Sequence, residues 1–245
     1  MLVVSRGQAK ASIYVNEREK RETENDKVIL LDFWASMVGL RVRVALAEKK
    51  IEYEYIEEDS ASNVPSPLLM KMNPIHKKIP VLIHNGRPVC DSLVALEYID
   101  EVWKDDKARL LPSDPYERAN ARFWADYIDK LYENYGRKIW MTKGETQEGA
   151  KKGLIDSLKL LEGAALGDKP YFGGESFGFA DIALIGIYSW LYALEIFGNF
   201  SVAAECPKLA AWGERCRQRA SVAKSLPEPH KIYEMILDLK KTYGL

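Results

Sequence analysis

The stretch from Val28 to Leu46 changes its hydrophobic period partway along, and this change most limits what the chain can fold into. Residues 28–33 form a short apolar run of strand length, and after Ser36 and Gly39 the apolar residues recur at helical spacing. The pattern predicts a strand that turns sharply into a helix. Such a turn places Ser36 beside a helix N-terminus, where backbone N–H groups and the helix dipole favour an anion such as a thiolate. An ordinary helix cap is the alternative role for the same residue.

Strand patterns continue only in the first part of the chain. The pattern next predicts an exposed strand at 52–57 and a short helix at 68–72. Two antiparallel strands follow, at 79–83 and 88–90, joined by a turn at Asn85-Gly86. A helix capped by Asp91 and Ser92 comes after them. A βαβ unit followed by a ββα unit is the arrangement of a thioredoxin-like domain. The sequence therefore predicts an α/β thioredoxin-like N-terminal domain over residues 28–103.

The rest of the chain carries helical patterns only. Residues 104–112 form a charged linker, and 113–245 are predicted to be an all-α C-terminal domain. A length of 245 residues permits one large domain or two small ones, and the change of pattern favours two. The most apolar stretch, 182–197, is shorter than a membrane span and contains Glu195, so it is predicted to be a buried core helix.

Residues 1–27 differ in composition from the remainder of the chain. They lack the long apolar stretch of a secretory signal, and 17–27 are almost entirely charged, with both signs mixed. We expect a solvated, mobile extension here. A short cleaved targeting segment at the very start is the alternative.

Charge and cysteine usage exclude several classes of function. A net charge of −1 gives no field that attracts nucleic acid or an anionic membrane surface. The cysteines Cys90, Cys206 and Cys216 have no metal-ligand spacing, and their odd number prevents complete pairing within the chain. They are interpreted as reduced thiols, which predicts a cytoplasmic protein without a bound metal.

Three further features fit an anionic, peptide-like ligand. Ile79-Pro80 opens a strand and is a candidate cis bond that would present the Ile79 backbone to an extended molecule; a trans proline is the ordinary alternative. Asp91 and Ser92 at a helix start suit a carboxylate and an ammonium, although they also suit a simple cap. Lys78 offers a cation, although a single lysine is usually solvated. Each signal is weak when taken separately.

Ser36 is a poor candidate for a nucleophile. The sequence has three histidines, and none is spaced to act as its base; His84, for example, lies beside the hairpin turn. A serine without a base is weakly nucleophilic. Its hydroxyl is better suited to donate a hydrogen bond to a group that is already anionic.

The order and spacing of these features closely resemble the tau class of plant glutathione transferases, from about Val28 to Leu245. The runs that carry the resemblance are Leu30–Ser36, Gly39–Arg43, Ala45–Lys49, Met72–Gly86, Leu111–Pro115, Ala121–Asp126, Gly136–Trp140, Tyr171–Gly174 and Ser221–Pro227. The resemblance implies the glutathione transferase fold and a cytosolic homodimer. It also implies an enzyme of detoxification that conjugates glutathione, its co-substrate, to hydrophobic electrophiles, with hydroperoxide reduction in some members.

The resemblance also assigns roles to individual residues. Ser36 would stabilise the glutathione thiolate, and Ile79 would pair its backbone with the cysteinyl part of glutathione. Asp91 and Ser92 would hold the γ-glutamyl end, while Lys78 would neutralise the glycyl carboxylate. The implied hydrophobic substrate site consists of Val38, Arg137, Trp140, Trp190, Met235 and Leu239. For the aromatic members of this set, plain core packing is the alternative.

The chain departs from the family pattern within the site itself. Met37-Val38 replaces the usual Pro-Phe, which loosens the turn and removes an aromatic wall. Asp91 replaces a glutamate, and Pro65 falls near the place of a lysine that the family often brings to the glycyl carboxylate. Two functions therefore stay open: a catalytic transferase, favoured by Ser36, and a low-turnover carrier of hydrophobic ligands on the same fold.

Overall fold

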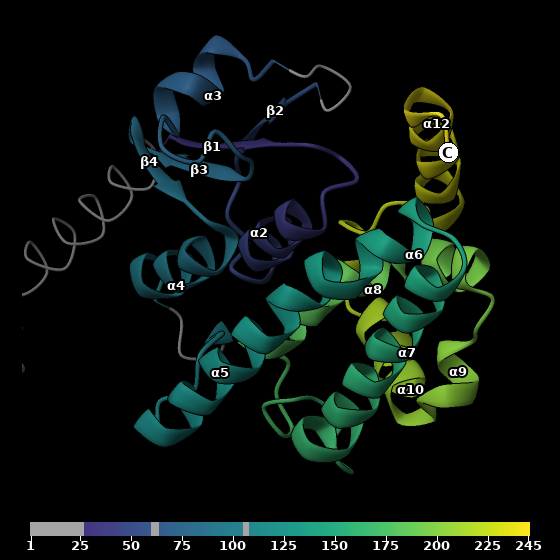
Figure 1. The fold of residues 1–245 in the computed structure, drawn as a ribbon. Coiled ribbons are helices and arrows are strands. Elements are labelled where there is room, and N and C mark those ends of the chain that lie inside the picture. The colour runs from purple at the N-terminus through teal and green to yellow at the C-terminus, as the bar shows by residue number, and fades with distance from the viewer. Residues whose placement is uncertain (1–26, 60–63, 105–107) are drawn as a thin grey trace, which may run out of the picture.

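The computed structural model describes residues 27–59, 64–104 and 108–245. The predicted N-terminal extension, apart from Lys27, lies outside the described residues, as do 105–107 of the predicted linker. The described chain forms an α/β unit followed by a helical unit (Figure 1). The elements of the first unit are β1 (Val28–Asp32), α2 (Met37–Glu48), β2 (Glu54–Glu57), α3 (Pro67–Met72), β3 (Val81–His84), β4 (Arg87–Cys90) and α4 (Ser92–Val102).

The sheet has the order β2-β1-β3-β4, with β1 at its centre. β1 runs parallel to β2 and antiparallel to β3, and β3 and β4 form the predicted hairpin. Asn85 and Gly86 both have positive φ angles, 51° and 77°, as this tight hairpin turn requires. The strand-to-helix order predicted for the first domain is confirmed.

The two faces of the sheet follow the period of its strands. Leu30 and Leu82 point into the main core, where α2 and α4 cover the sheet, while Leu31 and Val81 point to the opposite face beneath α3. Figure 1 shows α3 on the outer side of the sheet and α2 and α4 on the side of the helical unit. This arrangement places the start of α2, with Ser36, at the boundary between the two units.

The helical unit surrounds one central helix. Its elements are α5 (Pro115–Leu131), η2 (Tyr132–Gly136), α6 (Arg137–Met141), α7 (Glu145–Leu160), η3 (Leu161–Leu166), α8 (Phe179–Gly198), α9 (Val202–Glu205), α10 (Pro207–Arg217), α11 (Ala220–Ala223) and α12 (Pro229–Tyr243). α8 is long and apolar enough to cross a membrane by length and composition alone, but 78% of its most apolar window is buried inside the fold. It packs against α2, α5 and α12, as the predicted core helix should.

Several details of the helical unit were not predicted, among them a second π-helical segment, η3, at the end of the helix predicted for 146–166. A π-helical turn, η2, interrupts what the sequence predicts as one helix from Pro115 past Tyr135, and it leads directly into α6. At Gly136 a side chain would collide with the ring of Tyr132, so the glycine permits the close packing of this turn. The short helices α9 and α11 were also missed, because four residues are too few to show a period.

Charged side chains link the first unit to the helical unit and to the connecting segment. Arg219 binds Glu48 through both carboxylate oxygens, at 3.1 and 2.8 Å, which ties the C-terminal end of α2 to the segment before α11. Asp100 of α4 accepts hydrogen bonds of 3.0 Å from the backbone N–H groups of Leu110 and Leu111 in the connecting segment. Charge-assisted and bidentate contacts of this kind fix geometry well.

Candidate active site

Ser36 lies where the sequence places it, as the N-cap of α2. Its backbone is extended, and its Oγ accepts a hydrogen bond of 3.0 Å from the backbone N–H of Gly39. This bond uses an oxygen lone pair and leaves the hydroxyl proton available to a further acceptor. The residue is partly exposed at the boundary between the two units. Ser36 is therefore both the helix cap and a donor beside a helix N-terminus.

The turn that carries Ser36 is hydrogen-bonded to three other elements. Glu57 of β2 accepts a bond of 3.1 Å from the backbone N–H of Trp34. Arg43 of α2 donates to the Trp34 carbonyl at 2.9 Å, and the indole of Trp190 in α8 donates to the Ala35 carbonyl at 2.8 Å. The position of Ser36 is thus set by residues far apart in the sequence.

Ile79-Pro80 is a cis peptide bond, and this prediction is confirmed. Within the described part of the chain, the Ile79 backbone makes no hydrogen bond. Ile79 stands just before β3, whose residue Val81 pairs with Leu31 of β1. Its peptide groups therefore suit an extended ligand that continues the sheet.

Asp91 and Ser92 lie at the start of α4, but each already has a partner. Asp91 Oδ1 accepts from the backbone N–H groups of Leu93 at 2.9 Å and Val94 at 3.3 Å, so the capping role that the sequence allowed is present. Ser92 is buried, and its Oγ accepts a hydrogen bond of 3.1 Å from Arg41. The second Asp91 oxygen and the Ser92 hydroxyl proton are what these residues can offer a ligand.

The predicted cation, Lys78, is exposed beside Ile79. Its backbone carbonyl accepts a hydrogen bond of 2.9 Å from the Asn73 side chain, which fixes the segment before the cis bond. Pro65 is described and partly buried, whereas residues 60–63 of the same loop lie outside the described residues. The roles assigned to Lys78, Asp91 and Ser92 stay predictions.

The residues of the predicted hydrophobic site come from four elements. Val38 lies in the first turn of α2, Arg137 in α6 is exposed, and Met235 and Leu239 lie on the partly buried side of α12. The two tryptophans differ from this group because both are almost fully buried, with 4% of Trp140 and 6% of Trp190 exposed. Core packing, the alternative considered for these aromatics, accounts for most of their surface.

Both indoles make specific polar contacts inside the core. Trp140 donates from its Nε1 to the Tyr132 hydroxyl at 3.1 Å, and the Tyr132 ring packs edge-on against Trp190 at 5.3 Å between centroids. Burial raises the pKa of Tyr132 to about 12, so it remains a neutral phenol. The three rings form a wall beside the π-helical turn, and Trp190 connects this wall to the Ser36 turn.

Sequence reasoning missed a buried carboxylate beneath Ser36. Asp32, at the end of β1, is fully buried, and its Oδ2 lies 3.3 Å from Nε of Arg43. Burial raises the pKa of Asp32 to about 7, although the Arg43 charge, the Phe33 backbone N–H and the Ser36 hydroxyl oppose this shift. A side chain at Gly39 would overlap the Asp32 carboxylate. Charged residues in an otherwise apolar strand and helix were the available signal.

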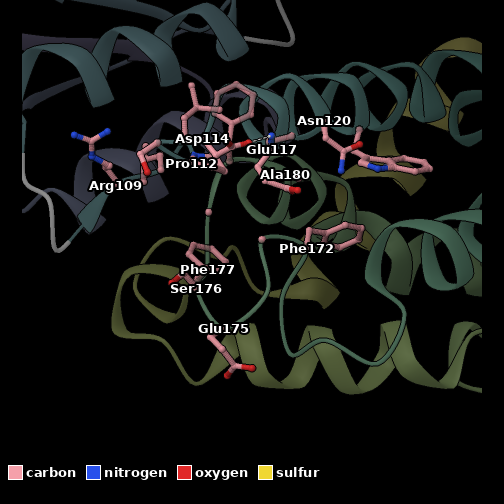
Figure 2. Close-up of a pocket in the computed structure, with 18 of the residues that line it drawn as sticks. Arg109, Pro112, Asp114, Glu117, Asn120, Phe172, Glu175, Ser176, Phe177 and Ala180 are labelled. Atoms are coloured by element: carbon pink, nitrogen blue, oxygen red, sulfur yellow. Dashed lines mark hydrogen bonds between the residues drawn. The ribbon is translucent and has the colours of Figure 1, made fainter.

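A separate cavity of about 610 Å³ is lined by the connecting segment 108–114 and by residues of the helical unit. Figure 2 shows it between the start of α5, with Asp114, Glu117 and Asn120, and the segment that contains Phe172 and Phe177. None of the predicted site residues lines it. Within the described residues, no group of three or more His, Cys, Asp or Glu side chains is arranged to hold a metal ion.

A thioredoxin-like domain with a serine at the first helix, a cis-proline before β3 and an all-helical second domain defines the glutathione transferase fold. The family model described as the N-terminal domain of glutathione S-transferase matches residues 26–101, and the model for the C-terminal domain matches residues 123–220. Together they cover most of the chain. The chain belongs to the glutathione S-transferase family.

Curated relatives place the chain in the plant tau class. It is 66% identical to a probable glutathione S-transferase, parC, of Nicotiana tabacum, with 90% of this chain and 99% of that protein covered. It is 59% identical to glutathione S-transferase U19 of Arabidopsis thaliana, with 89% and 98% covered. The predicted family, fold and class of enzyme are confirmed.

Solved structures of glutathione transferases support the same family and class. Rice GST1, described in complex with glutathione, superposes with a TM-score of 0.84 at 46% identity, covering 90% of this chain and 99% of its own. The tau-class enzyme of mango, Mangifera indica, superposes with a TM-score of 0.80 at 40% identity, covering 87% and 98%. The prediction of glutathione as the co-substrate is confirmed.

Proposed function

We propose that this glutathione S-transferase adds the thiolate of glutathione to hydrophobic electrophiles, with Ser36 stabilising the thiolate. The observation that carries the proposal is the geometry of Ser36, whose Oγ accepts from Gly39 at 3.0 Å and so keeps its proton for a ligand at the N-terminus of α2. A hydroxyl held in this way donates to sulfur without having to reorient.

The chemical gain is a lower pKa for the bound thiol. A free thiol has a pKa of about 8.5, so most of it is protonated near neutral pH. Each unit by which the site lowers this pKa stabilises the thiolate, relative to the thiol, by about 1.4 kcal/mol. The thiolate sulfur then forms a bond to the electrophilic carbon, and with an aryl halide the halide ion leaves.

The remaining residues of the site would orient glutathione. We assign the Ile79 backbone to the cysteinyl part, the free oxygen of Asp91 and the Ser92 hydroxyl to the γ-glutamyl end, and exposed Lys78 to the glycyl carboxylate. This leaves the sulfur beside Ser36 and facing the helical unit. Holding two reactants together supplies much of the rate of a bimolecular reaction.

The electrophile would bind between the start of α2 and the end of α12. Val38, Met235 and Leu239 are partly exposed there and supply apolar surface, and Arg137 supplies a charge at the edge. Trp140 and Trp190 contribute through the wall that they form with Tyr132. A site with little aromatic surface suits aliphatic or adaptable electrophiles.

The decisive experiment compares the unmodified protein with Ser36→Ala. Glutathione affinity, the pKa of the bound thiol from its thiolate absorbance in the ultraviolet, and conjugation of an aryl halide are measured in both. In Ser36→Ala we expect a glutathione affinity within a few-fold of that of the unmodified protein. The pKa of the bound thiol should be at least about one unit higher, and the conjugation rate at least about tenfold lower. Equal rates would refute the role of Ser36. No turnover in the unmodified protein, together with tight binding of an apolar dye, would instead support a carrier.

We propose that the enzyme is a homodimer that pairs through α4 and α5. Val94 and Val102 on α4 and Tyr116 and Phe123 on α5 are apolar side chains that remain 41–76% exposed. Light scattering should give twice the mass of the chain for the unmodified protein and a smaller mass for Phe123→Glu. A monomeric mass for the unmodified protein would contradict this proposal.

We also propose a cytoplasmic location, which is supported by three cysteines that are all free thiols. Cys206 and Cys216 are fully buried, and burial raises the pKa of Cys206 to about 11, so it stays protonated and unreactive. Microscopy of the full chain with a fluorescent protein at its C-terminus tests the location. Signal confined to an organelle would contradict it.

A further inference from the structure

We infer that Arg43 is a positioning residue that holds the Ser36 turn in its donating geometry, while Asp32 holds Arg43. The inference rests on the proposed function and extends it, because it names the group that keeps Ser36 in place. Arg43 does not reach the ligand site itself; it acts through the backbone of the turn.

The guanidinium of Arg43 joins three segments: the Ser36 turn, the segment before α12 and the end of β1. Its Nη2 donates to the Trp34 carbonyl at 2.9 Å and lies 3.4 Å from the Ser36 carbonyl, so it binds the turn on both sides of Ala35. Its Nη1 reaches the Ser225 carbonyl at 3.5 Å, in the segment that leads to α12. Only 12% of the side chain is exposed, so little water competes for these contacts.

Asp32 forms an ion pair with the Nε side of the guanidinium. The carboxylate is fully buried and lies 3.3 Å from Nε of Arg43. It also lies against Gly39, the residue whose N–H binds Ser36 Oγ, because a Cβ at Gly39 would overlap it. Asp32, Gly39 and Ser36 therefore form one compact group, with Arg43 closing it from the side.

Arg43 also supplies the positive charge that faces the buried Asp32 carboxylate below the Ser36 turn. Burial raises the pKa of Asp32, and the positive charge of Arg43 opposes this rise and satisfies part of the negative charge. Within the described residues, neither oxygen of the Asp32 carboxylate makes a hydrogen bond, so the Ser36 hydroxyl proton is not held by this group. Ser36 Oγ accepts from Gly39, and its proton is left to serve the sulfur of glutathione.

The test measures the pKa of the bound glutathione thiol from its thiolate absorbance. Arg43→Met removes the guanidinium and keeps an unbranched side chain, and Arg43→Lys keeps the charge. Because Arg43→Met leaves a buried carboxylate without its cation, the pair of changes Asp32→Asn and Arg43→Met is made as well. Arg219→Met is the matched control, since Arg219 also joins the two units but binds Glu48 and does not touch the turn.

We expect Arg43→Met, alone and with Asp32→Asn, to raise the bound thiol pKa by about one unit, which lowers the thiolate fraction about tenfold below that pKa. The turnover rate should fall by a similar factor, while glutathione affinity changes less than about twofold. Arg43→Lys should restore part of the loss. Arg219→Met should lower thermal stability without moving the thiol pKa.

A double-mutant cycle with Ser36→Ala tests whether Arg43 acts through Ser36. If Arg43 acts through Ser36, then Arg43→Met has little further effect on rate or thiol pKa once Ser36 is alanine. Additive effects, or an unchanged thiol pKa in every Arg43 variant, would overturn the inference. If the unmodified protein itself fails to lower the thiol pKa, the proposed function fails first, which is a distinct result.

Discussion

The indole nitrogen of Trp190 donates a 2.8 Å hydrogen bond to the carbonyl of Ala35, the residue directly before Ser36. Trp190 belongs to the central helix of the second unit. The helical domain therefore helps to shape the turn that carries Ser36, the proposed hydrogen-bond donor to the thiolate. Its place in the wall beside the π-helical turn, together with this bond, explains why a tryptophan predicted to face the substrate is buried.

Replacing Trp190 with phenylalanine should therefore affect both stability and chemistry. The Ala35 carbonyl loses its donor in a buried setting, which costs about 1–3 kcal/mol of unfolding free energy, measured by urea denaturation. We also expect a higher pKa for the bound glutathione thiol. Trp140→Phe is the control, since it removes an indole that donates to Tyr132 and not to the turn. Equal thiol pKa shifts in both variants would contradict this account.

The buried carboxylate of Asp32 predicts a pH-dependent stability. Burial raises its pKa to about 7, so the folded protein retains a proton that the unfolded chain has already released. The free energy of unfolding should accordingly fall as the pH rises from about 4 to about 7, by a few kcal/mol, and level off above that range. Asp181, whose pKa burial raises to about 6, adds to the same trend.

Asp32→Asn should reduce this slope without abolishing it. Urea denaturation at a series of pH values gives the comparison. The charged groups that face Asp32 are Arg43 of α2 and Glu57 of β2, which act in opposite directions on its pKa. An identical slope in the variant and in the unmodified protein would mean that Asp32 is ionised throughout this range.

Asp181 is expected to matter for folding more than for chemistry. Its carboxylate accepts from the backbone N–H groups of Phe172 and Gly178 and from the Trp212 indole, at 3.0, 2.9 and 2.8 Å. Asp181→Ala leaves three buried donors without an acceptor and should cost about 4 kcal/mol or more. Ser201→Ala, which removes an exposed cap of α9, should cost about 1 kcal/mol by the same denaturation assay.

Replacing the unusual pair Met37-Val38 with Pro-Phe should increase both the stability of the fold and the affinity for an aromatic electrophile. Met37 is the first residue of α2, where a proline fits because the Ser36 hydroxyl binds the N–H of Gly39 and not that of Met37. Met37→Pro should stabilise the fold by about 0.5–1 kcal/mol. Val38→Phe adds a ring at a partly exposed position and should lower KM for an aryl halide several-fold. An unchanged KM would remove Val38 from the substrate site.

Local patterns in the sequence predicted much of this architecture. The Ser36 cap, the hairpin at Asn85-Gly86 and the helix start at Asp91 each depend on neighbouring residues, and each is present in the structure. The cis bond before Pro80 was only a weak local signal, and the family resemblance made it specific.

Other features could not be predicted because they depend on distant parts of the chain. Helical period shows that α2 has a buried side, but it does not show that Arg41 is buried and Arg43 partly buried among polar partners. Nor does it show that Ser92 is occupied by Arg41 before any ligand arrives. Tertiary contacts decide these points, and the contact between Ala35 and Trp190 spans 155 residues.

That long-range contact has a consequence for folding during synthesis. A ribosome makes the chain from its N-terminus, so the residues of the sheet and the serine emerge long before α8 does. When the residues of the thioredoxin-like half are complete, the indole that donates to its Ala35 carbonyl is still unsynthesised. The turn that carries Ser36 therefore lacks one of its hydrogen-bond donors until Trp190 has been made, which requires most of the chain to have been synthesised.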